Sequence, residues 1–151
     1  MKTMFEAATA DEVRARVGEL TPESEKLWGK MSAAQMMEHC ARSLEWAVGD
    51  SVPPKLALPL RVIGKAIKPL ALGSDRPMRP NSPTAPDLLV RDSPDFDAGR
   101  VRLFTLIDRF VAGGAAGCTE LPHSFFGKMT PDEWGVLVYK HMDHHLRQFG
   151  V

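Results

Sequence analysis

Residues 133–150 read EWGVLVYKHMDHHLRQFG, and this stretch decides the fold because it has the pattern of one long amphipathic helix. At about 100° per residue, its large apolar side chains fall on one arc. They are Trp134, Val138, Met142, Leu146 and Phe149. The charged side chains of Lys140, Asp143 and Arg147 fall on the opposite side, which we expect to face water. The stretch therefore predicts a helix with one buried face, and other helices are needed to cover that face.

Helix starts outside this stretch are marked by capping boxes, in which a hydroxyl side chain and an acid or amide three residues later satisfy each other's backbone N–H groups. The pattern occurs as Thr130 with Glu133, Ser32 with Gln35, Thr9 with Glu12 and, most weakly, Thr21 with Ser24. Apolar periodicity predicts helices over 9–19, 32–48, 57–70, 97–112 and 131–149, and a short turn over 22–28. No segment alternates like a strand. We therefore expect an all-α protein, an antiparallel four-helix bundle with an extra short N-terminal helix.

A long proline-rich loop interrupts the helical pattern over 73–95. Its prolines are Pro77, Pro80, Pro83, Pro86 and Pro94, and a proline at every third residue favours extended chain. Long loops in compact domains often cover binding sites, so this loop either roofs a site or lies as a strap across the bundle. If it roofs a site, Asn81, Arg76 and Arg79 are the residues that would contact an anionic substrate.

Size and charge exclude several classes of protein. A chain of 151 residues is expected to form one domain, 1–151. The 19 basic residues equal the 19 acidic ones, so no global field attracts nucleic acid or an anionic membrane. No run approaches the roughly 20 apolar residues of a membrane-spanning helix. Two distant cysteines, Cys40 and Cys118, fit no disulfide framework, so we expect a cytoplasmic protein without nucleic-acid or membrane partners.

A histidine pair lies inside the apolar arc of the last helix. His141 and His145 are one turn apart, and side chains at this spacing can point at a common metal ion. His144 and Gln148 flank the pair. The run HMDHH lacks a glutamate after its first histidine, so the metalloprotease mechanism does not apply.

A metal with an open coordination position needs a third protein ligand. His39 is the better candidate because it lies mid-helix, on the shoulder of the apolar face of AAQMMEHCARSLEW. His123, in the turn before the last helix, is nearer a rim than a core. Without a metal, a hydrogen-bonded network with His144 and Gln148 would also satisfy the buried rings.

Two segments resemble a conserved-domain branch of the DinB-like superfamily of metalloenzymes. They are WGKMSAAQMMEHC (28–40) and HSFFGKMTPDEWGVLVYKHMDHHLRQFG (123–150), and the resemblance runs nearly end to end. It implies a four-helix bundle in which His39, His141 and His145 hold a divalent metal. The chain departs from the branch at Ser124, where the branch has proline after the histidine, which weakens any role built on His123.

The resemblance implies a metal-dependent enzyme with a small-molecule substrate, because characterised relatives include transferases and isomerases that use low-molecular-weight thiols. We expect a thiol-dependent transferase, with a metal-activated-water hydrolase and a non-catalytic or homodimeric structural bundle as alternatives. Zinc, nickel and iron all suit imidazole ligands. His144, Gln148, His123 and Asn81 are candidates for supporting the ligands or facing the substrate, and no catalytic residue is assigned.

Overall fold

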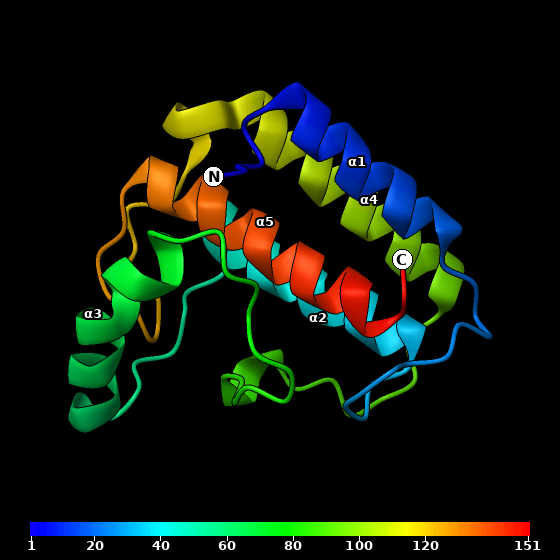
Figure 1. Cartoon of the computed structure of the whole chain (residues 1–151), viewed down its shortest axis with the longest axis horizontal. Helices are drawn as coiled ribbons and strands as arrows, with labels where there is room; N and C mark the ends of the chain where they lie inside the picture. The colour runs from blue at the N-terminus through cyan, green and yellow to red at the C-terminus, as the bar shows by residue number, and fades with distance from the viewer.

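The computed structural model describes all 151 residues and is all-helical, which confirms the predicted fold class. Five α-helices and two short 3₁₀ helices make up the chain (Figure 1). They are α1 (Ala7–Glu19), α2 (Ala33–Val48), α3 (Leu58–Leu72), η1 (Pro86–Leu88), α4 (Phe96–Gly113), η2 (Gly114–Gly117) and α5 (Pro131–Gln148). No strand is present, and the β-type pairing is confined to one isolated bridge between His123 and Gly127. No helix has the length and apolar character needed to cross a membrane.

Two of the predicted capping boxes are confirmed. At the start of α2, Ser32 accepts from the backbone N–H of Gln35, whose side chain bonds back to the Ser32 N–H. Thr130 and Glu133 do the same at the start of α5. Each box satisfies two of the backbone donors that a helix start leaves unpaired. Both helices that carry the predicted histidines therefore begin where their sequences indicate.

The other two predicted capping boxes do not form. Helix α1 begins at Ala7, so Thr9 lies within its first turn, where its hydroxyl donates to Glu6 at 3.1 Å instead of capping. Thr21 and Ser24 form only a turn, and no helix follows over 22–28. A hydroxyl three residues before a polar side chain is common in turns as well as at helix starts, which explains the error at Thr21.

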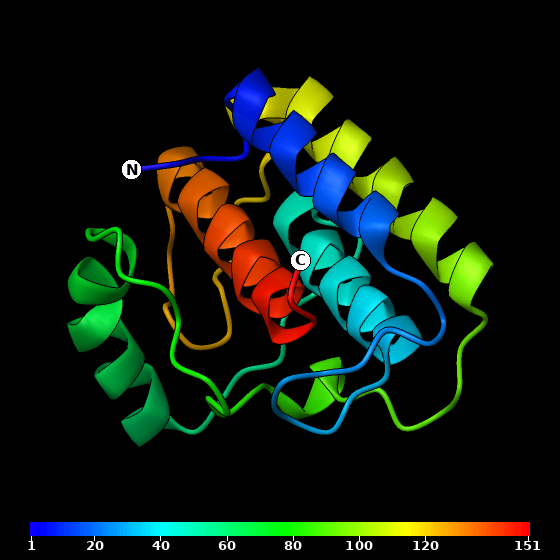
Figure 2. The ribbon, with the colours of Figure 1, turned by 45° about the vertical axis from the view of Figure 1, so that its right-hand side comes forward.

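Helices α1, α2, α4 and α5 lie side by side around one hydrophobic core, and α3 stands apart at the margin in both ribbon views (Figures 1 and 2). The fully buried core side chains include Val13 of α1, Met37 and Leu44 of α2, Leu103 and Ile107 of α4, and Met142 and Leu146 of α5. The core therefore joins the first and last helices, which lie far apart in the sequence.

The N-terminal helix is not the extra helix that we expected. It packs against α4 and α5 through one buried face that includes Val13 and Val17. Helix α3 takes the peripheral place instead, because it packs mainly on α5 and buries only Gly64 and Leu72. Its other large apolar side chains face outward.

The 73–95 segment crosses one side of the molecule and forms hydrogen bonds with both α5 and α2. At its start, the Ser74 carbonyl accepts from Lys140 Nζ on α5 at 2.8 Å. Further along, Gln35 Nε2 on α2 donates to the Asp92 carbonyl at 2.9 Å. Lys140 was expected to face water but is buried, because the end of α3 and the start of this segment cover it.

Candidate metal centre

Three histidines from two helices meet between α2 and α5. His39 on α2 and His141 and His145 on α5 offer ring nitrogens that all lie within 4.8 Å of one another. The closest pair, His39 Nε2 and His141 Nε2, is 2.9 Å apart. His39 and His145 are buried, and His141 is partly exposed. The structure therefore brings together the three residues that the sequence and the resemblance single out.

The ring of His39 is oriented by the backbone of the 73–95 segment. Its Nδ1–H donates to the carbonyl oxygen of Leu88, in η1, at 2.9 Å. Because a neutral imidazole carries one proton, this bond leaves Nε2 with a free lone pair. The free nitrogen is the one that points at His141.

The ring of His145 is oriented in the same way by a side chain. Its Nδ1–H donates to Oε1 of Gln148, one turn further along α5, at 2.9 Å. The amide of Gln148 is fixed in turn, since its Nε2 donates to the carbonyl of Trp28 at 2.7 Å. Gly29 allows this approach: its φ of 79° suits glycine, and a Cβ there would lie 2.4 Å from Gln148 Nε2. His145 therefore also presents a free Nε2.

Burial keeps the cluster uncharged. Desolvation, followed by the neighbouring rings of His145 and His39, holds the pKa of His141 well below its ordinary value. Desolvation and the nearby His39 lower the pKa of His145 to about 3, and burial also lowers the pKa of His39. All three rings are neutral at pH 7, so they are already in the protonation state that binds metal.

The donor set fits a divalent ion. Imidazole nitrogens bind zinc at about 2.0–2.1 Å, which in a tetrahedral site places two ligand nitrogens roughly 3.3 Å apart. The ring nitrogens of His39, His141 and His145 bracket that spacing, since one pair is 2.9 Å apart and all lie within 4.8 Å of one another. Three protein ligands leave one coordination position for water or substrate, as in catalytic zinc sites.

The remaining predicted residues lie outside the group of three. His144 is buried beside Trp28, with their rings 5.8 Å apart. Asn81 is exposed in the 73–95 segment, at a positive φ of 57°. Of His144, Gln148, His123 and Asn81, Gln148 is the one that hydrogen-bonds to a ligand candidate, His145.

His123 belongs to a separate aromatic cluster. Its ring packs against Trp46, Phe126 and Trp134, with ring centres 5.1–5.9 Å away. Its Nδ1 accepts the backbone N–H groups of Phe125 and Phe126, both at 3.2 Å. These bonds hold the turn before α5 in shape, and burial lowers the pKa of His123 to about 4.

Two carbonyl groups that orient the site, those of Leu88 and Trp28, were not found by sequence reasoning. Every residue type carries a backbone carbonyl, so no side-chain pattern marks them. Gly29 is the one signal that points to this part of the chain, because glycine permits both the turn and the close contact.

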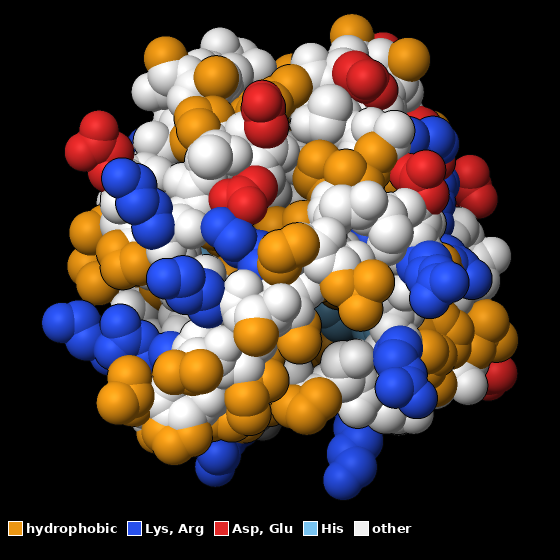
Figure 3. All heavy atoms as spheres, turned by 60° about the vertical axis from the view of Figure 1, so that its left-hand side comes forward, with side chains coloured by type: hydrophobic (Ala, Val, Ile, Leu, Met, Phe, Trp, Pro, Cys, Tyr) orange, Lys and Arg blue, Asp and Glu red, His pale blue; other side chains and the backbone are white.

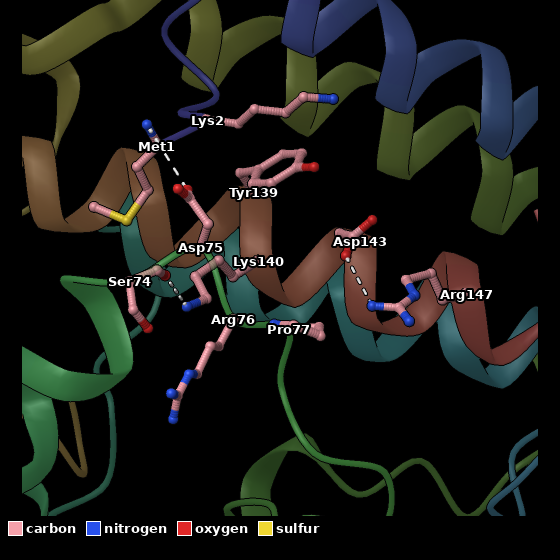
Figure 4. A pocket seen from close by; sticks show the side chains of 10 residues that line it. All are labelled: Met1, Lys2, Ser74, Asp75, Arg76, Pro77, Tyr139, Lys140, Asp143 and Arg147. Carbon is pink, nitrogen blue, oxygen red and sulfur yellow. Dashed lines mark hydrogen bonds and ion pairs between the residues drawn. The ribbon is translucent and has the colours of Figure 1, made fainter.

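A cleft lies on another side of α5. It has a volume of about 440 Å³, and none of the five histidines lines it. Figure 4 shows Tyr139, Lys140, Asp143 and Arg147 of α5 around it, with Arg76 of the 73–95 segment at its edge. On the face shown in Figure 3, a histidine side chain is visible at the bottom of a hollow between hydrophobic and basic side chains.

Replacing Gln148 with methionine should weaken metal binding while the protein stays folded. The thioether keeps the length of the side chain but cannot accept the Nδ1–H of His145, so that ring loses its fixed orientation. Loss of such a partner typically costs about 10–100-fold in metal affinity. Competition with a chromophoric chelator measures this change. An affinity within twofold of wild type would show that Gln148 does not position the ligand.

The fold and the cluster together define a class: an all-helical protein in which three imidazoles from two helices lie close enough to hold one metal ion. The chain belongs to the family described as Protein of unknown function (DUF1569), whose model matches residues 2–150. Among curated proteins no relative matches the chain, and no solved structure matches it either.

Proposed function

We propose that the chain is a divalent-metal-dependent enzyme with His39, His141 and His145 as metal ligands, acting as a thiol-dependent transferase. One observation carries the proposal. The Nδ1 atoms of His39 and His145 are both bound to fixed acceptors, which leaves their Nε2 atoms free, and ring nitrogens of all three histidines lie within 4.8 Å of one another. Supporting acceptors of this kind are typical of metal-ligating histidines.

Charge balance favours an anionic partner at the open position. Three neutral imidazoles leave the full charge of a divalent ion uncompensated at a buried site, and a thiol that coordinates such an ion loses its proton. The thiol would give up its proton to solvent, and the thiolate would form a sulfur–carbon bond to an electrophile whose leaving group departs with the bonding electrons. The chemistry that the ion supplies is therefore ionisation of the thiol.

The thiol in this proposal comes from outside the chain. Cys40 is fully buried on α2, and burial raises the pKa of its thiol far above the ordinary value. Burial also raises the pKa of Cys118 to about 11. Neither side chain forms a thiolate at neutral pH, so a low-molecular-weight thiol supplies the nucleophile.

We also infer that α1, α2, α4 and α5 form the antiparallel four-helix bundle of a DinB-like protein, with α3 added at its edge. The shared core of these helices supports this arrangement. The resemblance of residues 28–40 and 123–150 to that superfamily supports it as well. A crystal structure with a metal ion bound would test the arrangement and the ligand set together.

An assay with a chloronitrobenzene electrophile and a panel of low-molecular-weight thiols tests the proposed reaction. Protein loaded with zinc, nickel or iron should form the thioether and release chloride, and a chelator should abolish the rate. His39→Ala should be inactive with every thiol. Metal-dependent turnover of ester substrates without thiol would favour the hydrolase, and no metal dependence in either assay would favour a non-catalytic bundle.

A further inference from the structure

Helix α3 differs from the other helices in its orientation. Its apolar side faces away from the protein, whereas theirs face the core. Its large exposed side chains are Leu58 at 68%, Leu60 at 46%, Val62 at 60%, Ile63 at 51%, Ile67 at 41% and Leu70 at 67%. At about 100° per residue these six positions, with Ala66 and both prolines of the helix, fall on one continuous arc of roughly 200°. No charged residue interrupts that arc.

The inward side of α3 is narrow and is held by few contacts. Gly64 lies against the turn before α5, where an added Cβ would be 2.0 Å from the carbonyl oxygen of Phe125. Lys68 Nζ bridges the Lys128 carbonyl and the Glu133 carboxylate, each at 2.9 Å. These contacts fix the orientation of the helix, so the outward direction of its apolar side is built into the fold.

The charge around this apolar side has one sign. Residues 51–74 contain Lys55, Arg61, Lys65 and Lys68 and no acidic residue, although the whole chain is neutral. Of the four, Lys68 pairs with Glu133, and the other three are exposed without an ion pair. In Figure 3, hydrophobic and basic side chains gather on the lower left of the face, and no acidic side chain is seen there. The surface therefore combines an apolar strip with a basic border.

A second copy of the chain is a poor occupant for this strip. Packing α3 on its own copy would bring Arg61 and Lys65 near their counterparts, with no acidic residue in either segment to pair with them.

We propose that α3 binds the surface of an anionic phospholipid bilayer and lies in the plane of its headgroups. A helix with a continuous apolar side and flanking Lys and Arg residues suits that position, because the apolar side chains enter the acyl boundary while the cations meet lipid phosphates. The net charge of zero indicated no membrane partner, because the basic residues of 51–74 are cancelled in the total by acidic residues elsewhere in the chain.

Vesicle sedimentation of the full chain tests the proposal. Wild type should sediment with vesicles of equal phosphatidylcholine and phosphatidylglycerol, and at least about tenfold less with pure phosphatidylcholine or at high salt. Val62→Asp should weaken binding by about tenfold or more. Val101→Asp on α4 is the matched control, since that valine is 65% exposed against 60% for Val62, and it should bind within twofold of wild type.

Thermal melts of both variants verify that they are folded. No binding of wild type to anionic vesicles, or an equal loss in the two variants, would overturn the proposal. A concentration-dependent dimer that Val62→Asp abolishes, without vesicle binding by wild type, would also overturn it and assign the strip to a second copy.

Discussion

His145→Ala should remove bound metal from the purified protein, whereas His144→Ala should leave the metal in place. The two residues are neighbours on α5 and both are buried, but only His145 belongs to the group of three. Removing one of three ligands leaves two imidazoles, which cannot hold an ion through dilution and desalting. We expect about one ion per chain in wild type and His144→Ala, and less than a tenth of that in His145→Ala, by elemental analysis.

Thermal unfolding gives the same comparison an independent readout. An ion that binds only the folded chain stabilises it by about 2.7 kcal/mol at 100 times its dissociation constant. Added metal should raise the melting temperature of wild type and of His144→Ala, and leave that of His145→Ala unchanged. Equal metal content and equal metal-induced shifts in all three proteins would rule out the proposed ligand set.

Acidification should destabilise the metal-free protein between pH 7 and pH 5. The folded pKa of His123 is about 4, below the ordinary value of about 6.5 that applies when the chain is unfolded. The unfolded chain therefore binds the proton first, so stability is complete above about pH 6.5 and falls as the pH drops toward 4. At pH 5 this residue alone accounts for about 2 kcal/mol, and the lowered pKa values of His39, His141 and His145 act in the same direction.

His123→Gln isolates that contribution. Glutamine has no titrating group, and its amide oxygen can still accept a backbone N–H in the turn before α5. Urea unfolding in the presence of a chelator at pH 7, 6 and 5 should show a loss about 2 kcal/mol smaller in the variant than in wild type. If both proteins lose the same free energy, His123 is not protonated on unfolding in the way its surroundings imply.

Much of the helical structure could be predicted from local patterns. The capping boxes at Ser32 and Thr130 are short-range signals, and both boxes form as expected. The HxxxH spacing of His141 and His145 is equally local, since one turn of helix places the two rings together. The apolar face of its helix already made His39 the better candidate for a third ligand, and the resemblance strengthened that choice, because helix periodicity does not determine which face of one helix meets another.

What the sequence did not reveal depends on tertiary packing. Lys140 is buried although the helical wheel places it in water, because α3 and residue 74 cover that side of α5. The peripheral position of α3 was missed for a related reason. An apolar arc reads the same on a helical wheel whether it faces the core or faces outward.

The two hydrogen bonds that orient the ligand rings, from His39 to Leu88 and from His145 to Gln148, differ in how well they tolerate substitution. The acceptor at residue 88 is a main-chain oxygen, which almost any amino acid there would still provide. Position 148 has no such freedom, because its amide must accept from His145 and donate to Trp28 at once. Sequence drift at residue 88 can therefore leave the site intact so long as the path of the backbone is kept, and an insertion or deletion beside it would be far more damaging than a substitution.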